Sequence, residues 1–295
     1  MFNPFDESNV SDAEDIALVE RASGGDKEAL DALIRRHQAW IYNVAVRMVW
    51  EPRDAEDATQ EVLIKVITKL GSFQGQSKFR TWLYRIVVNH IMNMKRRGLE
   101  VHEYTFGRMG DELDETPDGE LPDPRTVPVD LRLLVEEAKI GCTAAMLLCL
   151  DRRQRLVYVL AEMFGVTDQI GGELLEISPD NFRQCLARAR RDLYSFMNDK
   201  CGLINEANPC RCAKKTRAFM DAGFVDPERL RFVPEHVARI RDIAQRRHQD
   251  IVSLGDDQYA EIFRDQPFLP APQLTELLQR TIADEHFRQT LNLDA

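Results

Sequence analysis

One stretch of the chain combines cations, aromatic rings and an amide in a pattern suited to single-stranded nucleic acid. Residues 78–97 carry six basic side chains and no acidic one. Apolar residues recur there at helical spacing, so most of the cations gather on the other face of a predicted helix. Cations attract phosphates, and aromatic rings stack on unpaired bases. The candidate residues are Lys78, Phe79, Arg80, Trp82, Arg85, Asn89, Lys95, Arg96 and Arg97.

A basic face that meets only solvent is the simpler alternative for this helix. The helix contains no acidic residue that would relieve repulsion among its cations, which favours the nucleic-acid interpretation. Arg80, Arg85, Lys95 and Arg96 are expected on the outer face, and Phe79 is expected on the apolar stripe as well as beside the site.

A predicted helix at 54–70 has a polar stripe opposite its apolar one. A partly polar face that includes an aliphatic residue such as Ile64 suits the rim of a protein contact. A face that meets only solvent fits the same periodicity, so both interpretations stay open. The residues assigned to this stripe are Asp54, Asp57, Gln60, Glu61 and Lys65.

A third pattern predicts a helix-turn-helix near residue 178. Ser178 supplies a capping hydroxyl, and Pro179 fits the first position of the following helix. Arginine and glutamine near the start of such a helix suit contacts in the major groove, although a helical hairpin with a basic exterior fits equally well. The candidate contacts are Ser178, Asp180, Asn181, Arg183, Gln184, Arg188 and Arg191.

Three thiols, those of Cys201, Cys210 and Cys212, fall within twelve positions. With a fourth ligand, for which His236 and Cys185 are candidates, they would form a zinc site. No complete four-ligand spacing is present, so inert structural thiols remain an alternative.

A redox sensor is a further alternative for this cluster. Lys214 and Lys215 follow the last thiol and are expected to lower the pKa of the cysteines. Cys142, Cys149 and Cys185 lie in helical patterns and are interpreted as small buried apolar residues.

Composition limits the class of protein. The 295 residues exceed one small helical module, so several domains are expected. A net charge of −10 argues against a protein that coats nucleic acid without selectivity. The acidic N-terminus lacks the features of a signal peptide, and no stretch has the roughly 20 apolar residues of a membrane span, so a cytoplasmic protein without membrane insertion is expected.

The periodicity is helical nearly throughout, which predicts an all-α fold. Helices are expected at 26–49, which Asp26 can cap, and at 54–70 and 79–97, within a first domain at 1–98. Residues 98–128 carry nine acidic and two basic side chains with little periodicity, and predict a flexible acidic linker at 99–130. A second helical domain is expected at 131–199, with a cysteine-containing helical extension at 200–295.

The extension has amphipathic stretches at 234–250, 256–264 and 272–291. One interpretation is a small helical domain that packs on the rest of the chain. The other is a built-in regulator that covers a binding surface until a signal arrives.

Together these segments resemble the extracytoplasmic-function (ECF) sigma factors of bacterial RNA polymerase, over about residues 17–197. Four motifs carry the resemblance in order: Asp54-Ala55-Glu56-Asp57-Ala58-Thr59-Gln60-Glu61-Val62; Phe73 with Phe79-Arg80-Thr81-Trp82-Leu83-Tyr84-Arg85-Ile86 and Asn89; Leu150-Asp151-Arg152-Arg153-Gln154-Arg155; and Ser178 to Leu193.

The resemblance implies a role for each motif. Asp54, Asp57, Gln60 and Glu61 would contact core RNA polymerase. The basic helix would capture an unstacked base of the −10 element, and the helix after Ser178 would read the −35 element. The linker would run toward the polymerase active centre. An anti-sigma partner and autoregulation by the extension are both open.

The chain departs from the family pattern in two places. Asp151 stands where the family usually has proline. The segment 167–178 is one residue longer than usual and contains Gly171-Gly172, which predicts an irregular first helix of the helix-turn-helix.

Two other classes of function compete. A helix-turn-helix regulator that needs no polymerase is the alternative, and the motif at 54–62 argues against it. An enzyme is rejected because no phosphate-binding glycine loop, metalloprotease motif or nucleophile–base pair is found, and no cofactor is required.

Overall fold

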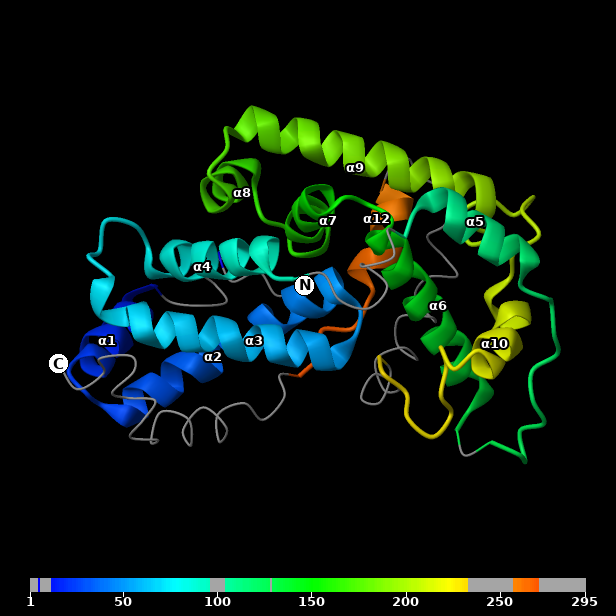
Figure 1. The fold of residues 1–295 in the computed structure, drawn as a ribbon, viewed down its shortest axis with the longest axis horizontal. Helices are drawn as coiled ribbons and strands as arrows, with labels where there is room; N and C mark the ends of the chain where they lie inside the picture. The colour runs from blue at the N-terminus through cyan, green and yellow to red at the C-terminus, as the bar shows by residue number, and fades with distance from the viewer. Residues whose placement is uncertain (1–4, 6–11, 96–103, 128, 233–256, 271–295) are drawn as a thin grey trace. The chain divides into compact units, whose positions relative to one another are not determined.

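The computed structural model describes residues 5, 12–95, 104–127, 129–232 and 257–270 (Figure 1). Every regular element in these ranges is a helix, which confirms the all-α prediction. Within the same ranges, no helix combines the length and the apolar character that crossing a bilayer requires.

Contacts divide the chain into two compact units. The first comprises 1–98, 159–185 and 269–295, and the second comprises 99–158 and 186–268. The expected boundary after residue 98 coincides with a boundary between units. The expected second domain at 131–199 is distributed over both units, and its functional limits stay a prediction.

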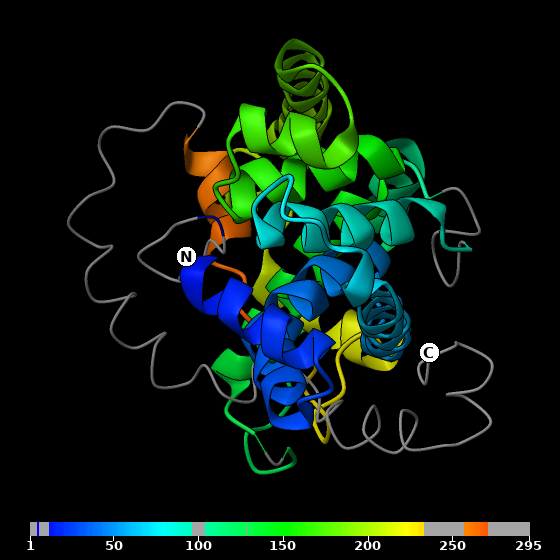
Figure 2. The ribbon, with the colours of Figure 1, turned by 90° about the vertical axis from the view of Figure 1, so that its left-hand side faces the viewer.

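The N-terminal helices of the first unit pack around one core. Helix α3 contacts α2 and α4, and α1 contacts α2 and α4. Figure 2 shows these blue and cyan helices from a second direction. The elements are α1 (Asp12–Ser23), α2 (Lys27–Val49), α3 (Pro52–Lys69), η1 (Leu70–Ser72) and α4 (Phe79–Asn93).

Local sequence signals account for the ends of these helices. The Asp26 side chain accepts hydrogen bonds from the backbone N–H groups of Glu28 and Ala29, at 2.9 and 3.1 Å, and caps α2 as predicted. Pro52 occupies the first turn of α3, where its missing N–H has no consequence, so α3 begins two residues earlier than predicted.

The core of this unit is aromatic. Trp40 is fully buried, and its ring centroid lies 4.2 Å from that of Tyr84 and 5.3 Å from that of Phe164. Burial of such rings supplies much of the apolar contact area that holds small helical domains together.

The first unit also contains the start of the helix-turn-helix. Its elements are η3 (Val159–Met163), α8 (Asp168–Leu175) and the first turns of α9 (Pro179–Lys200). Helix α8 is regular, contrary to the expectation from Gly171-Gly172. A Cβ atom on Gly171 would lie 2.2 Å from the Phe182 ring, and one on Gly172 would lie 2.8 Å from the Ile177 carbonyl oxygen. The two glycines therefore permit close packing of α8 against the next helix.

The second unit contains the remaining helices. Its core includes Leu134, Ala138 and Val225, which join α6 to the segment after α10. Stacked Tyr194 and Tyr259 rings, 4.4 Å apart, join α9 to α12. The elements are α5 (Phe106–Glu115), α6 (Leu131–Leu148), α7 (Arg152–Tyr158), most of α9, α10 (Cys212–Asp221) and α12 (Asp257–Arg264).

The segment predicted as an irregular linker contains helix α5. Thr105 caps this helix by accepting a hydrogen bond from the Arg108 N–H. Met109 and Leu113 are buried, one turn apart, so a short apolar stripe was present in the sequence. The surrounding carboxylates and Gly/Pro residues obscured it. Of the predicted stretches in the extension, 234–250 and 272–291 lie outside the described residues.

Candidate functional site

The polar face of α3 is exposed along its length. Asp57, Glu61 and Lys65 are exposed, and Asp54 and Gln60 are partly exposed, while Leu63 and Val66 are buried on the other side. The predicted division of this helix into two faces is confirmed.

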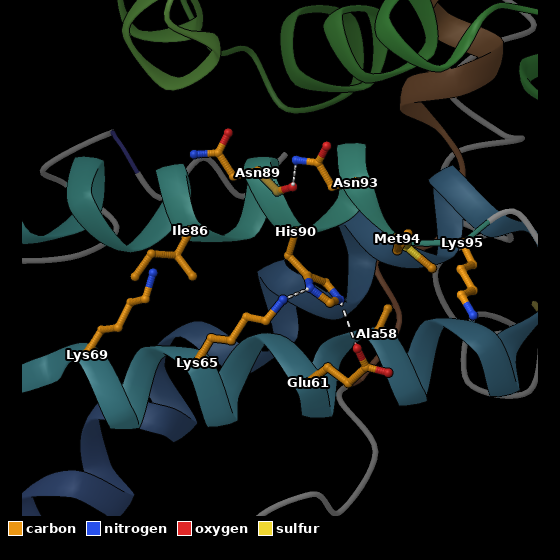
Figure 3. Close-up of a pocket in the computed structure, with 10 residues that line it drawn as sticks. All are labelled: Ala58, Glu61, Lys65, Lys69, Ile86, Asn89, His90, Asn93, Met94 and Lys95. Atoms are coloured by element: carbon orange, nitrogen blue, oxygen red, sulfur yellow. Dashed lines mark hydrogen bonds and ion pairs between the residues drawn. The ribbon is translucent and has the colours of Figure 1, made fainter. Parts of the chain in front are cut away.

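A groove of about 670 Å³ separates α3 from α4 (Figure 3). Inside it, the Lys65 ammonium lies 2.6 Å from Nδ1 of His90, and Nε2 of the same ring lies 3.5 Å from a Glu61 carboxylate oxygen. The lining residues are Ala58, Glu61, Lys65, Lys69, Ile86, Asn89, His90, Asn93, Met94 and Lys95.

His90 links the two helices as a neutral ring. Burial lowers its pKa, the Lys65 ammonium lowers it further, and the Glu61 carboxylate opposes both effects. A neutral imidazole accepts a hydrogen bond from Lys65 at Nδ1 and presents Nε2–H to Glu61. Two of the predicted docking residues are thus held in place from α4.

Three aromatic rings meet where the loop after η1 enters α4. The ring centroids of Phe73, Phe79 and Trp82 lie 5.4–5.6 Å from one another. Phe79 is fully buried, so it packs against the other two rings from the core side and cannot contact a base. Its prediction as a nucleic-acid contact is therefore wrong. Phe73 and Trp82 are partly exposed and remain available for stacking.

Arg80 was predicted on the outer face and is buried instead, with its side chain 2% exposed. Its Nε lies 3.6 Å from a carboxylate oxygen of Asp15, which is fully buried on α1, and 3.8 Å from Asp12. Asp15 also accepts a hydrogen bond from Arg36 at 2.9 Å and faces Nε2 of His37 at 3.3 Å. Helix α4 contains no acidic residue of its own, and α1 supplies the carboxylates that face Arg80.

This buried cluster keeps Asp15 ionised. Burial raises the pKa of Asp15, but the hydrogen bonds and charges of His37 and Arg36 outweigh it, so the pKa is lowered overall. Sequence reasoning missed α1 and its role. The acidic residues Asp12 and Asp15, three positions apart at the start of a helix, were the available signal.

The remaining polar candidates of the α4 region differ in accessibility. Lys78, Asn89 and Lys95 are exposed. Arg85 is partly exposed and lies 3.6 Å from Glu173 and 3.9 Å from Glu176, on and after α8. Arg96 and Arg97 lie outside the described residues.

Helix α9 presents its predicted outer face to solvent. The Ser178 hydroxyl accepts a hydrogen bond from the Asn181 N–H at 3.2 Å, which confirms the cap. Phe182, Ala189 and Leu193 are buried. The exposed residues include all of the predicted contacts, Ser178, Asp180, Asn181, Arg183, Gln184, Arg188 and Arg191.

Two of these arginines have acidic neighbours. Arg183 forms ion pairs with Asp168 on α8 and Asp180 on its own helix. Arg191 pairs with Asp192 at 2.9 Å. All three carboxylates are at least partly exposed, so DNA phosphates would have to compete with weak surface pairs only.

The thiols of the extension do not behave as predicted for a redox sensor. Burial raises the pKa of Cys201, Cys210 and Cys212, and the value for Cys212 reaches about 12. Lys215 does lower the pKa of Cys210, but burial and the neighbouring Cys201 outweigh it. Lys215 thus acts in the predicted direction, but the net effect on each thiol is a raised pKa, which favours the protonated, less nucleophilic form.

Comparison with known proteins finds a family match for one part of the chain. Residues 33–99 match the sigma-70 region 2 family. The RNA polymerase sigma-H factor of Pseudomonas aeruginosa is 43% identical over 84 residues, which is 28% of this chain and 44% of that protein. The ECF RNA polymerase sigma factor SigE of Mycolicibacterium smegmatis is 28% identical over 176 residues, 59% of this chain and 64% of that protein.

The chain therefore spans less than two thirds of the length of either relative. A solved structure of CnrH in complex with the cytosolic domain of CnrY shows 20% identity and a TM-score of 0.45, over 63% of this chain and 98% of that one.

Proposed function

We propose that this chain, whose residues 33–99 are a sigma-70 region 2 domain, is an alternative sigma factor of the ECF group. It binds core RNA polymerase and directs initiation at promoters with particular −10 and −35 elements. The observation that carries the proposal is the pairing, within the matched domain, of an exposed acidic face on α3 with an exposed aromatic and amide edge on α4.

The α3 face is the proposed polymerase contact. Asp57 and Glu61 are one turn apart and exposed, so basic groups of a partner can approach both carboxylates from the same side of the helix. The contact of His90 with Lys65 and Glu61 limits their freedom before binding, which lowers the entropic cost of association.

The α4 edge is the proposed −10 reader. Phe73 and Trp82 offer ring faces for a base that has left the stack, while Asn89 and Lys78 supply hydrogen bonds and charge. Extrusion of a base costs a few kcal/mol, which the polymerase would help to meet. Arg85 joins this surface when it leaves Glu173 and Glu176.

The outer face of α9 is the proposed −35 reader. Gln184 and Arg188 are exposed one turn apart, a spacing that lets both side chains enter the same major groove. Arg191 lies near enough to add a phosphate contact.

The linker and the extension are the proposed regulatory parts. Lys200 pairs with Asp114, and Lys215 lies 3.1 Å from Asp118, so acidic side chains of the linker are engaged by the extension. In a sigma factor whose linker enters the polymerase, these pairs would have to open. An anti-sigma partner would be a separate layer of control.

The regulator that acts without polymerase is not favoured, since it leaves the region 2 match unexplained. Transcription in vitro tests the proposal: the purified chain is combined with bacterial core polymerase that lacks sigma and with fragments of the source genome. We expect discrete start sites that disappear with Asp57→Ala and persist with Glu20→Ala, an exposed carboxylate on α1.

Absence of start sites, together with duplex binding by the protein alone, would contradict the proposal and favour the independent regulator. Start sites that survive Asp57→Ala would retain the sigma function and remove Asp57 from the polymerase contact.

A further inference from the structure

Helix α8, the first helix of the helix-turn-helix, belongs to the same compact unit as α4, and the two helices pack against each other. The segment before α8 is anchored in the aromatic core of this unit. Phe164 is 1% exposed, and its ring centroid lies 5.3 Å from that of Trp40 and 5.1 Å from the Arg47 guanidinium carbon. Burial of this ring holds α8 beside the basic helix.

Helix α8 is anionic. Residues 168–176, which are the helix and its C-cap, contain the carboxylates of Asp168, Glu173 and Glu176 and no lysine or arginine. The first helix of a helix-turn-helix crosses the DNA backbone, where phosphates repel carboxylates. The charge of α8 is therefore unsuited to a DNA contact, but it suits arginines of its own chain.

Each of these carboxylates faces an arginine that is a predicted DNA contact. A carboxylate oxygen of Glu173 lies 3.6 Å from Nη2 of Arg85, and one of Glu176 lies 3.9 Å from Nε of the same side chain. On the other side of the helix-turn-helix, Asp168 forms an ion pair with Arg183. One short helix thus places negative charge at an arginine of each predicted DNA-binding surface.

The contact with Arg85 is incomplete. Nε of Arg85 is enclosed, yet none of the described residues accepts a hydrogen bond from it. Glu173 and Glu176 are exposed, so their ion pairs with Arg85 are weak. An enclosed donor without an acceptor costs free energy, which a closer acceptor on a base or a phosphate would recover. Arg85 is held by α8 but is ready to change partners.

The backbone of Glu176 gives an independent reason to assign a task to its side chain. Glu176 ends α8 with φ of 55° and ψ of 43°, in the left-handed region. Glycine is the usual residue at such a helix end, because a Cβ atom is strained there. A strained residue of this kind is a sign of function, and the contact of Glu176 with Arg85 supplies one.

We propose that α8 is an internal cover of the −10 reader, in which Glu173 and Glu176 occupy Arg85 in place of DNA. The inference rests on the proposed sigma function, which assigns α4 to the −10 strand. Arg85 lies one turn from both Trp82 and Asn89 on α4, so the cover sits in the middle of the proposed reading edge. Capture of the −10 strand then requires that Arg85 exchange two carboxylates for acceptors of the nucleic acid.

Arginine modification tests the cover without reference to transcription. The full-length chain is treated with phenylglyoxal, and the modified arginines are identified by peptide mass spectrometry. In the double variant Glu173→Gln with Glu176→Gln, modification of Arg85 should become about threefold faster or more, since two weak ion pairs no longer compete. Arg188, an exposed arginine on α9, should keep its rate and serves as the internal reference.

Binding of a fluorescently labelled single strand, with the −10 sequence of a promoter recovered by the transcription experiment, measures the consequence. The double variant should bind it about threefold more tightly or better. This gain should vanish when Arg85→Ala is added. Glu20→Gln with Glu28→Gln removes two exposed carboxylates on α1 and α2, so it is the matched control and should gain much less.

Unchanged modification of Arg85 in the double variant would overturn the cover, whatever the transcription experiment shows. An equal gain in affinity in the Arg85→Ala background, or in the matched control, would also overturn it, because the carboxylates would then act only through the net charge. Faster modification of Arg85 in a chain that yields no start sites would support the contact and contradict the sigma function, so the two failures are distinguishable.

Discussion

Helices α4 and α9 both carry arginines that were predicted on an outer face, but the structure uses them differently. On α9, every predicted outward residue is exposed. On α4, Arg80 is buried against α1, Phe79 belongs to the core, and Arg85 faces two carboxylates. A helical pattern predicts exposure reliably only when a single side of the helix is covered.

The difference has a simple physical origin. An apolar stripe identifies the face that meets the main core, but it does not reveal a second element that covers the polar face. Helix α1 supplies that cover on α4, and Asp15 provides the charge that makes burial of Arg80 tolerable.

The largest difference between the two helices is expected for substitutions of Arg80. Arg80→Ala removes the buried guanidinium beside Asp15 and leaves only Arg36 and His37 near that carboxylate, so we expect a loss of about 3–5 kcal/mol in the free energy of unfolding. Arg188→Ala on α9, at an exposed position, should change stability by less than about 0.5 kcal/mol. Urea unfolding followed by circular dichroism measures both.

A double variant, Asp15→Asn with Arg80→Met, removes both charges and should recover part of the stability that Arg80→Ala loses. Equal stability of Arg80→Ala and Arg188→Ala would show that Arg80 is not a structural residue.

For DNA binding, we expect a substitution on α9 to have a large effect although it hardly changes stability. Arg188→Ala should weaken binding to the −35 part of a promoter by about tenfold, since a good base contact is worth about 1–3 kcal/mol. Binding to labelled duplex promoter fragments recovered from the transcription experiment measures it. Arg217→Ala, an exposed arginine on α10, is the control; similar losses in both variants would indicate a general charge effect.

The smallest effect is expected from pH, at the groove between α3 and α4. Because the pKa of His90 is lowered in the folded protein, the unfolded chain takes up this proton first, near its ordinary value of about 6.5. Stability should therefore fall as the pH drops through this value, and level off below the folded pKa. His90→Gln should flatten this dependence in urea unfolding from about pH 7.5 to about pH 5.5; equal slopes would show that another group causes it.

The sequence by itself determined the helical class, the caps at Asp26 and Ser178, the two faces of α3 and the outer face of α9. These features depend on neighbours within one or two turns, which a pattern records directly. It also carried the resemblance to sigma factors, since the order of motifs along the chain does not depend on how the segments pack.

Only the tertiary structure decided what lies at long range. In the structure, α1 covers Arg80, and Phe79 lies in the core next to Phe73 and Trp82. Helix α8 is regular although it contains two adjacent glycines. Such groupings arise because side chains that are distant along the chain share one buried space, and no local periodicity encodes which of them will meet.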